Sequence, residues 1–142
     1  MITVAEALAR LFALVEPLGA EEVPVERAAG RVLARDAVAG RDQPPFPASA
    51  MDGYAVAGAE AAPGARFRVV GEAAAGRRFA GRIGPGEAVR IFTGAPLPDG
   101  ADRVVIQEDT AREGEAVTLL DSLGAGPHVR PAGADFRAGD RL

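Results

Sequence analysis

Three loops of this sequence carry polar side chains that could perform chemistry. The first is rich in proline and ends in the pair Asp52-Gly53. A stiff proline segment followed by a turn glycine holds a carboxylate in a fixed position, where it can bind Mg²⁺ through oxygen or orient a water molecule. The alternative is that Asp52 starts a turn and bonds only to its own backbone. Taken alone, the dipeptide favours this structural role.

The second and third loops add a hydroxyl and an oppositely charged pair. A predicted strand ends in Thr93-Gly94, which would expose the threonine hydroxyl and the adjacent amides to an anion. The alternative is a polar strand end ahead of a proline turn. Residues 130–135 form a predicted tight turn that presents Arg130 and Asp135. Taken alone, such a turn most often belongs to an ordinary surface.

Several common chemistries are excluded by what the sequence lacks. It has no cysteine, which rules out disulfides, thiolate metal sites and cysteine nucleophiles. Its single histidine, His128, offers too few nitrogen ligands for zinc, and no Gly-x-Ser-x-Gly segment supports a serine hydrolase. All 16 basic residues are arginine, so a phosphate loop with its lysine is absent. Carboxylates and hydroxyls remain, and they suit hard cations and oxyanions.

The charge and hydropathy of the sequence limit the partners that the protein can bind. The formal net charge is −4, and the arginines are dispersed without interleaved aromatic residues, so we do not expect nucleic acid to bind. No apolar run approaches the length of a membrane span, and residues 1–15 are amphipathic instead of resembling a signal peptide. We therefore expect a soluble, cytoplasmic protein without a membrane partner.

One strong helix is predicted, and it lies at the beginning of the chain. Thr3 and Glu6 have the spacing of a capping box, and Pro17 ends the pattern. Between them an apolar stripe recurs at helical spacing, formed by Val4, Leu8, Leu11, Phe12 and Val15. The stripe favours a helix packed on a core, and the alternative is a helix that binds a partner.

The elements that must position the three loops are short strands between glycine and proline turns. Residues 26–29 are predicted to form a helical turn closed by Gly30. Strands are predicted at 32–38, 53–56, 67–70, 88–92, 103–107 and 117–120, with a short piece around Val129. The fold class is therefore mainly β with an N-terminal helix, in two small lobes of short, mostly antiparallel strands. We expect residues 1–44 to supply the helix and the first part of a base lobe, 45–128 an inserted β-rich lobe, and 129–142 the return to the base lobe.

Five segments together point to a family. They are residues 29–34, 44–46, 49–55, 91–96 and 104–108, and the most specific is Ser-Ala-Met-Asp-Gly-Tyr-Ala at 49–55. In this order they resemble the N-terminal region of MoeA-type molybdopterin molybdenumtransferases, which are related to the E domain of gephyrin. The resemblance covers essentially the whole chain.

This resemblance implies a reaction, a cofactor and site residues. Family members insert molybdate into adenylylated molybdopterin with a divalent metal, usually Mg²⁺, and act as homodimers in molybdenum cofactor biosynthesis. It implies catalytic roles for Asp52, Thr93 and Asp135, with Asp52 and Asp135 also organising the metal. It implies substrate contacts for Ser49, Thr93 and Arg130. Both substrates would be reached through the family's pterin-binding domain.

The chain also departs from the family pattern. We expect this chain to lack the family's pterin-binding domain and a further C-terminal β domain, so the resemblance implies that this chain alone is inactive and that its N-terminal apolar stripe is uncovered. Pro47-Ala48 stands where relatives commonly have Asp-Asn, and Ala134 where they commonly have Glu. One alternative is a stand-alone, non-enzymatic relative that acts as a protein-interaction module. Another is an independent hydrolytic pair formed by Asp52 and Asp135.

Overall fold

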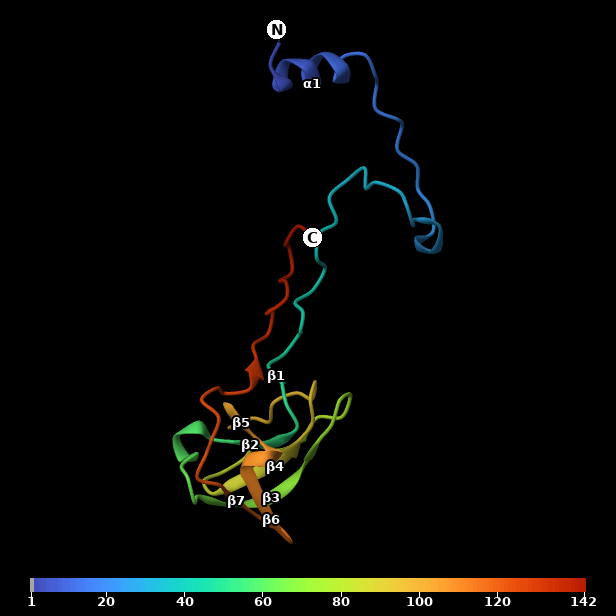
Figure 1. Cartoon of the computed structure of the whole chain (residues 1–142). Helices are drawn as coiled ribbons and strands as arrows, with labels where there is room; N and C mark the ends of the chain where they lie inside the picture. The colour runs from blue at the N-terminus through green and yellow to red at the C-terminus, as the bar shows by residue number, and fades with distance from the viewer. Residues whose placement is uncertain (1) are drawn as a thin grey trace. The chain divides into compact units, whose positions relative to one another are not determined.

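The computed structural model describes residues 2–142, which divide into two units, one that ends at Ala37 and one that comprises Val38–Leu142. The described residues contain one α-helix, in the first unit, and eight short β-strands, all in the second (Figure 1). The predicted class, mainly β with an N-terminal helix, is confirmed. Within residues 2–142, no helix is both long enough and apolar enough to cross a membrane.

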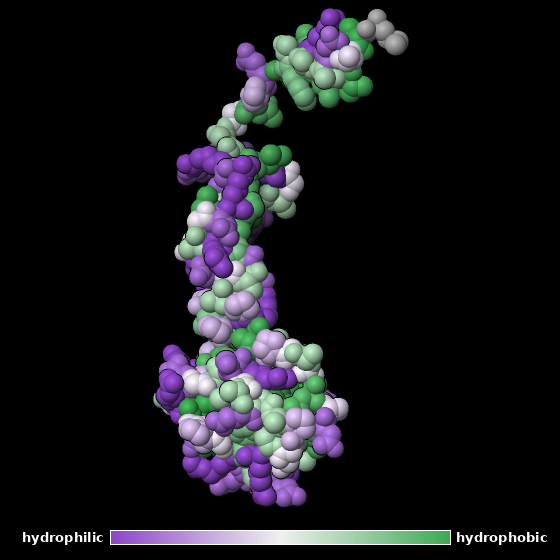
Figure 2. All heavy atoms as spheres, turned by 90° about the vertical axis from the view of Figure 1, so that its left-hand side faces the viewer, coloured by the Kyte–Doolittle hydropathy of each residue, from purple (hydrophilic) through white to green (hydrophobic). Residues whose placement is uncertain are grey.

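The first unit begins with the predicted helix, α1 (Val4–Phe12). Its capping box is formed in both directions: the Glu6 amide donates to the Thr3 hydroxyl over 3.2 Å, and the Thr3 amide donates to the Glu6 carboxylate over 2.7 Å. The helix ends at Phe12, one turn earlier than the apolar stripe. None of its side chains is buried, and the hydrophobic ones lie open on its surface (Figure 2).

The remainder of the first unit has little regular structure. A 3₁₀ turn, η1 (Val25–Arg27), lies one residue ahead of the predicted helical turn, and Gly30 follows with a φ of +78°. The strand predicted at 32–38 is wrong. A strand needs a neighbour to accept and donate its ladder bonds. Within this stretch the structure records a β-bridge at Val38, with Arg141, and no ladder of strand pairs.

A six-stranded sheet forms the body of the second unit, in the order β5-β2-β4-β3-β7-β6. Its strands are β2 (Gly53–Val56), β3 (Arg66–Ala73), β4 (Glu87–Ile91), β5 (Arg103–Ile106), β6 (Thr110–Glu113) and β7 (Ala116–Leu119). Only the β3–β4 pair is parallel, and every other pair in this sheet is antiparallel. Five of the predicted strands fall on these elements.

Side chains alternate along β2, and both faces of this strand are buried. Tyr54 and Val56 point into one apolar cluster, and Ala55 between them points into another. The first cluster also contains Phe67, Ala88, Val105, Val117 and Leu119. The second also contains Ala73, Ile83, Val89, Ile91, Ala95 and Val104. Because β2 is covered on both sides, its first residue is held in a fixed position.

A second, two-stranded sheet pairs β1 (Ala48–Ser49) with β8 (Val129–Arg130) in antiparallel register. Two isolated bridges extend this pairing away from the body, Val38 with Arg141 and Gln43 with Phe136. Residues 38–49 and 129–141 therefore run side by side (Figure 1). The division of the chain at 44/45 and 128/129 stays a prediction.

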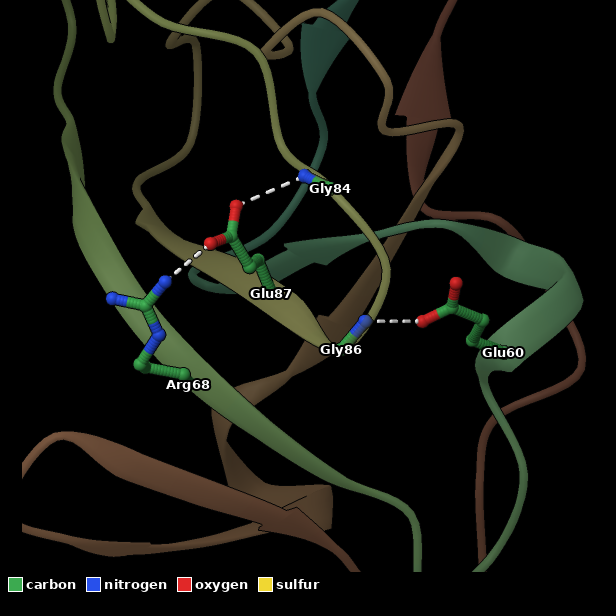
Figure 3. A network of polar contacts seen from close by, with 5 residues as sticks. All are labelled: Glu60, Arg68, Gly84, Gly86 and Glu87. Atoms are coloured by element: carbon green, nitrogen blue, oxygen red, sulfur yellow. Dashed lines mark hydrogen bonds and ion pairs between the residues drawn. The ribbon is translucent and has the colours of Figure 1, made fainter.

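Carboxylates on loop amides hold the turn that leads into β4. Glu87 accepts a hydrogen bond from the Gly84 amide over 2.9 Å and is ion-paired with Arg68 of β3. Glu60, in the 3₁₀ turn η2 (Gly58–Glu60), accepts from the Gly86 amide over 2.8 Å (Figure 3). These contacts hold the loop from which β4 begins.

Candidate functional site

The centre of the candidate site is the carboxylate of Asp52. Its Oδ1 accepts two hydrogen bonds from Thr93, one from the backbone amide and one from the hydroxyl, each 2.8 Å long. The two residues meet because Asp52 directly precedes β2, Thr93 follows β4, and these antiparallel strands place Gly53 opposite Ile91. Two residues that were separate candidates in the sequence therefore form one unit.

This contact changes the acidity of Asp52. The Thr93 amide lowers the pKa of the Asp52 carboxyl most, the Thr93 hydroxyl adds to the effect, and the positive charge of Arg90 contributes further; slight burial opposes all three. The carboxylate is therefore anionic near neutral pH and acts only as an acceptor. Its second oxygen, Oδ2, makes no hydrogen bond within residues 2–142.

Backbone contacts hold the Asp52 loop from several directions. The Asp52 carbonyl accepts from the amide of Gln107 over 3.0 Å, at the beginning of the 3₁₀ turn η3 (Gln107–Asp109). The Ala50 amide donates to the carbonyl of His128 over 2.9 Å. Gly53 packs so closely on β5 that a Cβ atom would lie 2.0 Å from the carbonyl oxygen of Val105. The loop is therefore fixed by its neighbours and has no room to adjust.

Ser49 belongs to the same scaffold. Its amide and carbonyl bond to the backbone of Ala95 and Gly94, over 3.0 and 2.9 Å, and tie the Asp52 loop to the Thr93 loop. Its side chain is buried, and its hydroxyl donates to the Met51 carbonyl over 2.6 Å. In the described chain this hydroxyl closes the turn that leads to Asp52. The substrate contact predicted for Ser49 stays a prediction.

Arg130 and Asp135 form a second unit. Their side chains make an ion pair, with 48% and 44% of the two side chains exposed. The turn between them is tied to the proline loop, because the Asp135 amide donates to the Gln43 carbonyl over 2.8 Å. No hydrogen bond or ion pair within residues 2–142 joins this pair to Asp52. The structure thus pairs four of the five polar candidates two by two, Asp52 with Thr93 and Arg130 with Asp135.

Comparison with known proteins agrees with this arrangement of elements. The family model of the MoeA N-terminal region, domains I and II, matches residues 2–142. This chain belongs to that family. The fold and the Asp52 loop can therefore be read as those of a MoeA N-terminal region.

Named relatives and solved structures support the same assignment. Two curated relatives are named molybdopterin molybdenumtransferase. The one from Synechococcus elongatus is 36% identical to this chain over 89% of its length, and the one from a Nostoc species is 38% identical over 93%. A crystal structure of the molybdopterin biosynthesis moeA protein from Pyrococcus horikoshii superposes with a TM-score of 0.85 at 33% identity, covering 97% of this chain. The chain spans 33%, 32% and 38% of these three proteins, about a third of each.

The described residues offer only some of the ligands that the magnesium ion implied by the family resemblance would need. Residues 2–142 contain no group of three acidic, histidine or cysteine side chains that could hold a metal. Asp52 fits the requirement for one ligand, since Mg²⁺ is usually held by one or two carboxylates together with water and substrate phosphates. Asp135 is engaged by Arg130. This MoeA region could thus supply one oxygen from Asp52 to a metal whose other ligands come from elsewhere.

Arg90 of the MoeA region was not assigned a role from the sequence. Its guanidinium donates to the carbonyl of Gly53 over 3.1 Å and to the side-chain oxygen of Gln107 over 2.7 Å. The available signal was a charged residue inside the otherwise apolar predicted strand 88–92, two residues before the aromatic Phe92. A charged residue in an apolar strand indicates a special environment, but the sequence does not show which residues Arg90 contacts.

The Asp52–Thr93 contact leads to a prediction about pH. In Thr93→Val the hydroxyl donor is lost and the amide donor remains, so we expect the pKa of Asp52 to rise only part of the way to the ordinary carboxyl value. A pKa lowered by folding gives stability that is present above the unfolded pKa and lost as the pH falls through the folded one. NMR titration of the Asp52 carboxyl carbon should show the rise. An unchanged midpoint would mean that the hydroxyl does not stabilise the anion.

Proposed function

We propose that this chain is the part of a molybdopterin molybdenumtransferase that presents an ionised Asp52 to the substrates, so that molybdate is inserted into adenylylated molybdopterin. The observation that carries the proposal is the pair of hydrogen bonds from Thr93 to one oxygen of Asp52. They fix the direction of the carboxylate and leave its second oxygen for a ligand. The substrates themselves would be held by another part of the enzyme or by a second subunit.

The residues of the site have distinct tasks under this proposal. Thr93 keeps Asp52 anionic and prevents its carboxylate from rotating, which pre-organises the negative charge. Asp52 would supply one oxygen to Mg²⁺, and the bound ion would offset the charge of the substrate's phosphate groups. The ion pair between Arg130 and Asp135 would offer a guanidinium to an anionic substrate if the pair opened. We include a homodimer in the proposal, because the incomplete metal site requires ligands from elsewhere.

A second candidate function is a non-enzymatic protein-interaction module. One observation favours it: the apolar side chains of α1 are exposed, among them Val4 at 77%, Leu11 at 59% and Phe12 at 69%. Exposed apolar surface of this kind marks a protein contact. The same exposure is expected if α1 contacts the remainder of a larger enzyme, so the two functions must be separated by experiment.

A chimeric enzyme provides that experiment. Residues 2–142 would replace the matching third of the Synechococcus elongatus relative, and molybdenum insertion would be measured from purified adenylylated molybdopterin and molybdate. We expect insertion by the chimera and none by this chain alone, because the chain carries only part of the metal site. The control is the unaltered relative. A chimera that melts cooperatively like the relative but inserts no molybdenum would contradict the proposal and favour the interaction module.

A further inference from the structure

We propose that Arg90 is a positioning residue that holds Asp52 and Thr93 in register. This inference rests on the function proposed above. Arg90 lies on β4 directly opposite Tyr54 of β2, so its side chain begins next to the strand that Asp52 leads into. It has no contact that would make it a ligand of the Asp52 carboxylate itself, and its donors are directed to the groups around that carboxylate.

Arg90 touches the surroundings of Asp52 on three sides. It donates over 3.1 Å to the carbonyl of Gly53, the residue that follows Asp52. It donates over 2.7 Å to the side-chain oxygen of Gln107. The backbone amide of Gln107 in turn donates to the Asp52 carbonyl over 3.0 Å. Its guanidinium also lies 4.6 Å from the ring centre of Phe92, the residue before Thr93. The Arg90 side chain thereby contacts three neighbours of the Asp52–Thr93 pair, namely Gly53, Gln107 and Phe92.

The geometry requires arginine and not merely a positive charge. Two different nitrogens of Arg90 donate to Gly53 and Gln107, while its guanidinium carbon lies over two aromatic rings, 4.6 Å from the centre of Phe92 and 5.3 Å from that of Tyr54. A lysine ammonium is a compact charge without a planar fork, so it cannot make both hydrogen bonds and both ring contacts at once. The charge of Arg90 also helps to lower the pKa of Asp52, which is a separate effect that lysine could preserve.

This separation of shape and charge gives a direct test in the chain as it stands. We would record NMR spectra of Arg90→Lys and Arg90→Met and titrate the Asp52 carboxyl. Both variants should shift the amide signals of Thr93 and Gln107, because both lose the fork. The pKa of Asp52 should rise in both variants as its hydrogen bonds from Thr93 are disturbed, and slightly more in Arg90→Met, because only that variant also loses the charge of Arg90, the smallest of the contributions. Unmoved Thr93 and Gln107 signals in both variants would overturn the proposal.

Arg68 offers a matched control. It lies on β3, next to β4, and makes an ion pair with Glu87 of β4 (Figure 3). Arg68→Met therefore removes an arginine that bridges two neighbouring strands, without touching any group around Asp52. We expect this variant to leave the Thr93 signal and the Asp52 titration unchanged. If Arg68→Met moved them as much as Arg90→Met does, the effect of Arg90 would be general to the sheet and the proposal would fail.

Kinetics of the chimeric enzyme complete the test. Positioning predicts that Arg90→Lys lowers kcat about ten- to a hundredfold with little change in KM, since a misplaced catalytic group costs this much. A direct contact between Arg90 and substrate predicts instead a raised KM with kcat retained, and that result would refute positioning. Failure of the proposed function would appear differently: the chimera without any substitution would be inactive, while the NMR result for Arg90 could still hold.

Discussion

Asp52→Asn in the chimeric enzyme is expected to lower molybdenum insertion about ten- to a thousandfold, comparable to the loss of one strong electrostatic contact. Asparagine keeps an oxygen that can accept both hydrogen bonds from Thr93, and it tolerates the same turn. It removes the negative charge that would attract a divalent metal. Insertion rates at saturating and limiting Mg²⁺ should show the loss.

The melting temperature separates this electrostatic role from a structural one. Asp52→Asn should melt close to the unsubstituted protein, and the small difference should disappear as the pH falls through the lowered pKa of Asp52. Asp52→Ala is the matched control, because it loses both the charge and the acceptor for Thr93 and should be inactive and less stable. Full activity in the Asn variant, with damage only in the Ala variant, would leave Asp52 as a turn residue.

Gly53→Ala is expected to cost about 3 kcal/mol of unfolding free energy, at the upper end of the usual range for overpacking. The added Cβ would lie 2.0 Å from the carbonyl oxygen of Val105, and the obstacle is backbone of β5, which cannot rotate away as a side chain could. Either β2 or β5 must move. Urea unfolding of the chain should show a lower midpoint with an unchanged slope.

Gly40→Ala is the control for that measurement. A Cβ at Gly40 would meet no atom within 4 Å, and its φ is not in the left-handed region. Alanine there should therefore be neutral or stabilise by about 0.4 to 1 kcal/mol, through the reduced freedom of the unfolded chain. Equal midpoints for Gly53→Ala and Gly40→Ala would show that β2 and β5 can separate without cost, against the close packing described above.

Local signals in the sequence were sufficient for the helix and most strands. Thr3 and Glu6 are three residues apart, so their capping box could be recognised without knowing the fold, and the structure confirms it. Strands such as 53–56 and 103–107 were marked by β-branched residues between turn glycines, and they fall on β2 and β5. The mistaken strand at 32–38 had the same composition. It forms no ladder with another strand, which composition does not reveal.

The contacts of the site depend on register, which is set by the whole sheet. Asp52 and Thr93 are 41 positions apart and meet only because β2 and β4 pair antiparallel with Gly53 opposite Ile91. A shift by one residue would turn every side chain of β4 to the opposite face. For the same reason Arg90 could not be linked to Gly53 or Gln107 beforehand. Asp52 and Thr93 were identified by type, and their pairing required the structure.

The paired flanks of the second unit have a mechanical consequence. Residues 38–49 and 129–141 run antiparallel and are joined at Val38–Arg141, Gln43–Phe136 and Ala48–Arg130. A pull on residues 38 and 141 would load these links one after another from the outside, as when a zipper opens. Links that bear force singly yield at lower tension than a sheet whose strands are sheared all at once. The flanks would therefore separate first. A pull on the two ends of this unit would open them before it disturbed the Asp52 loop.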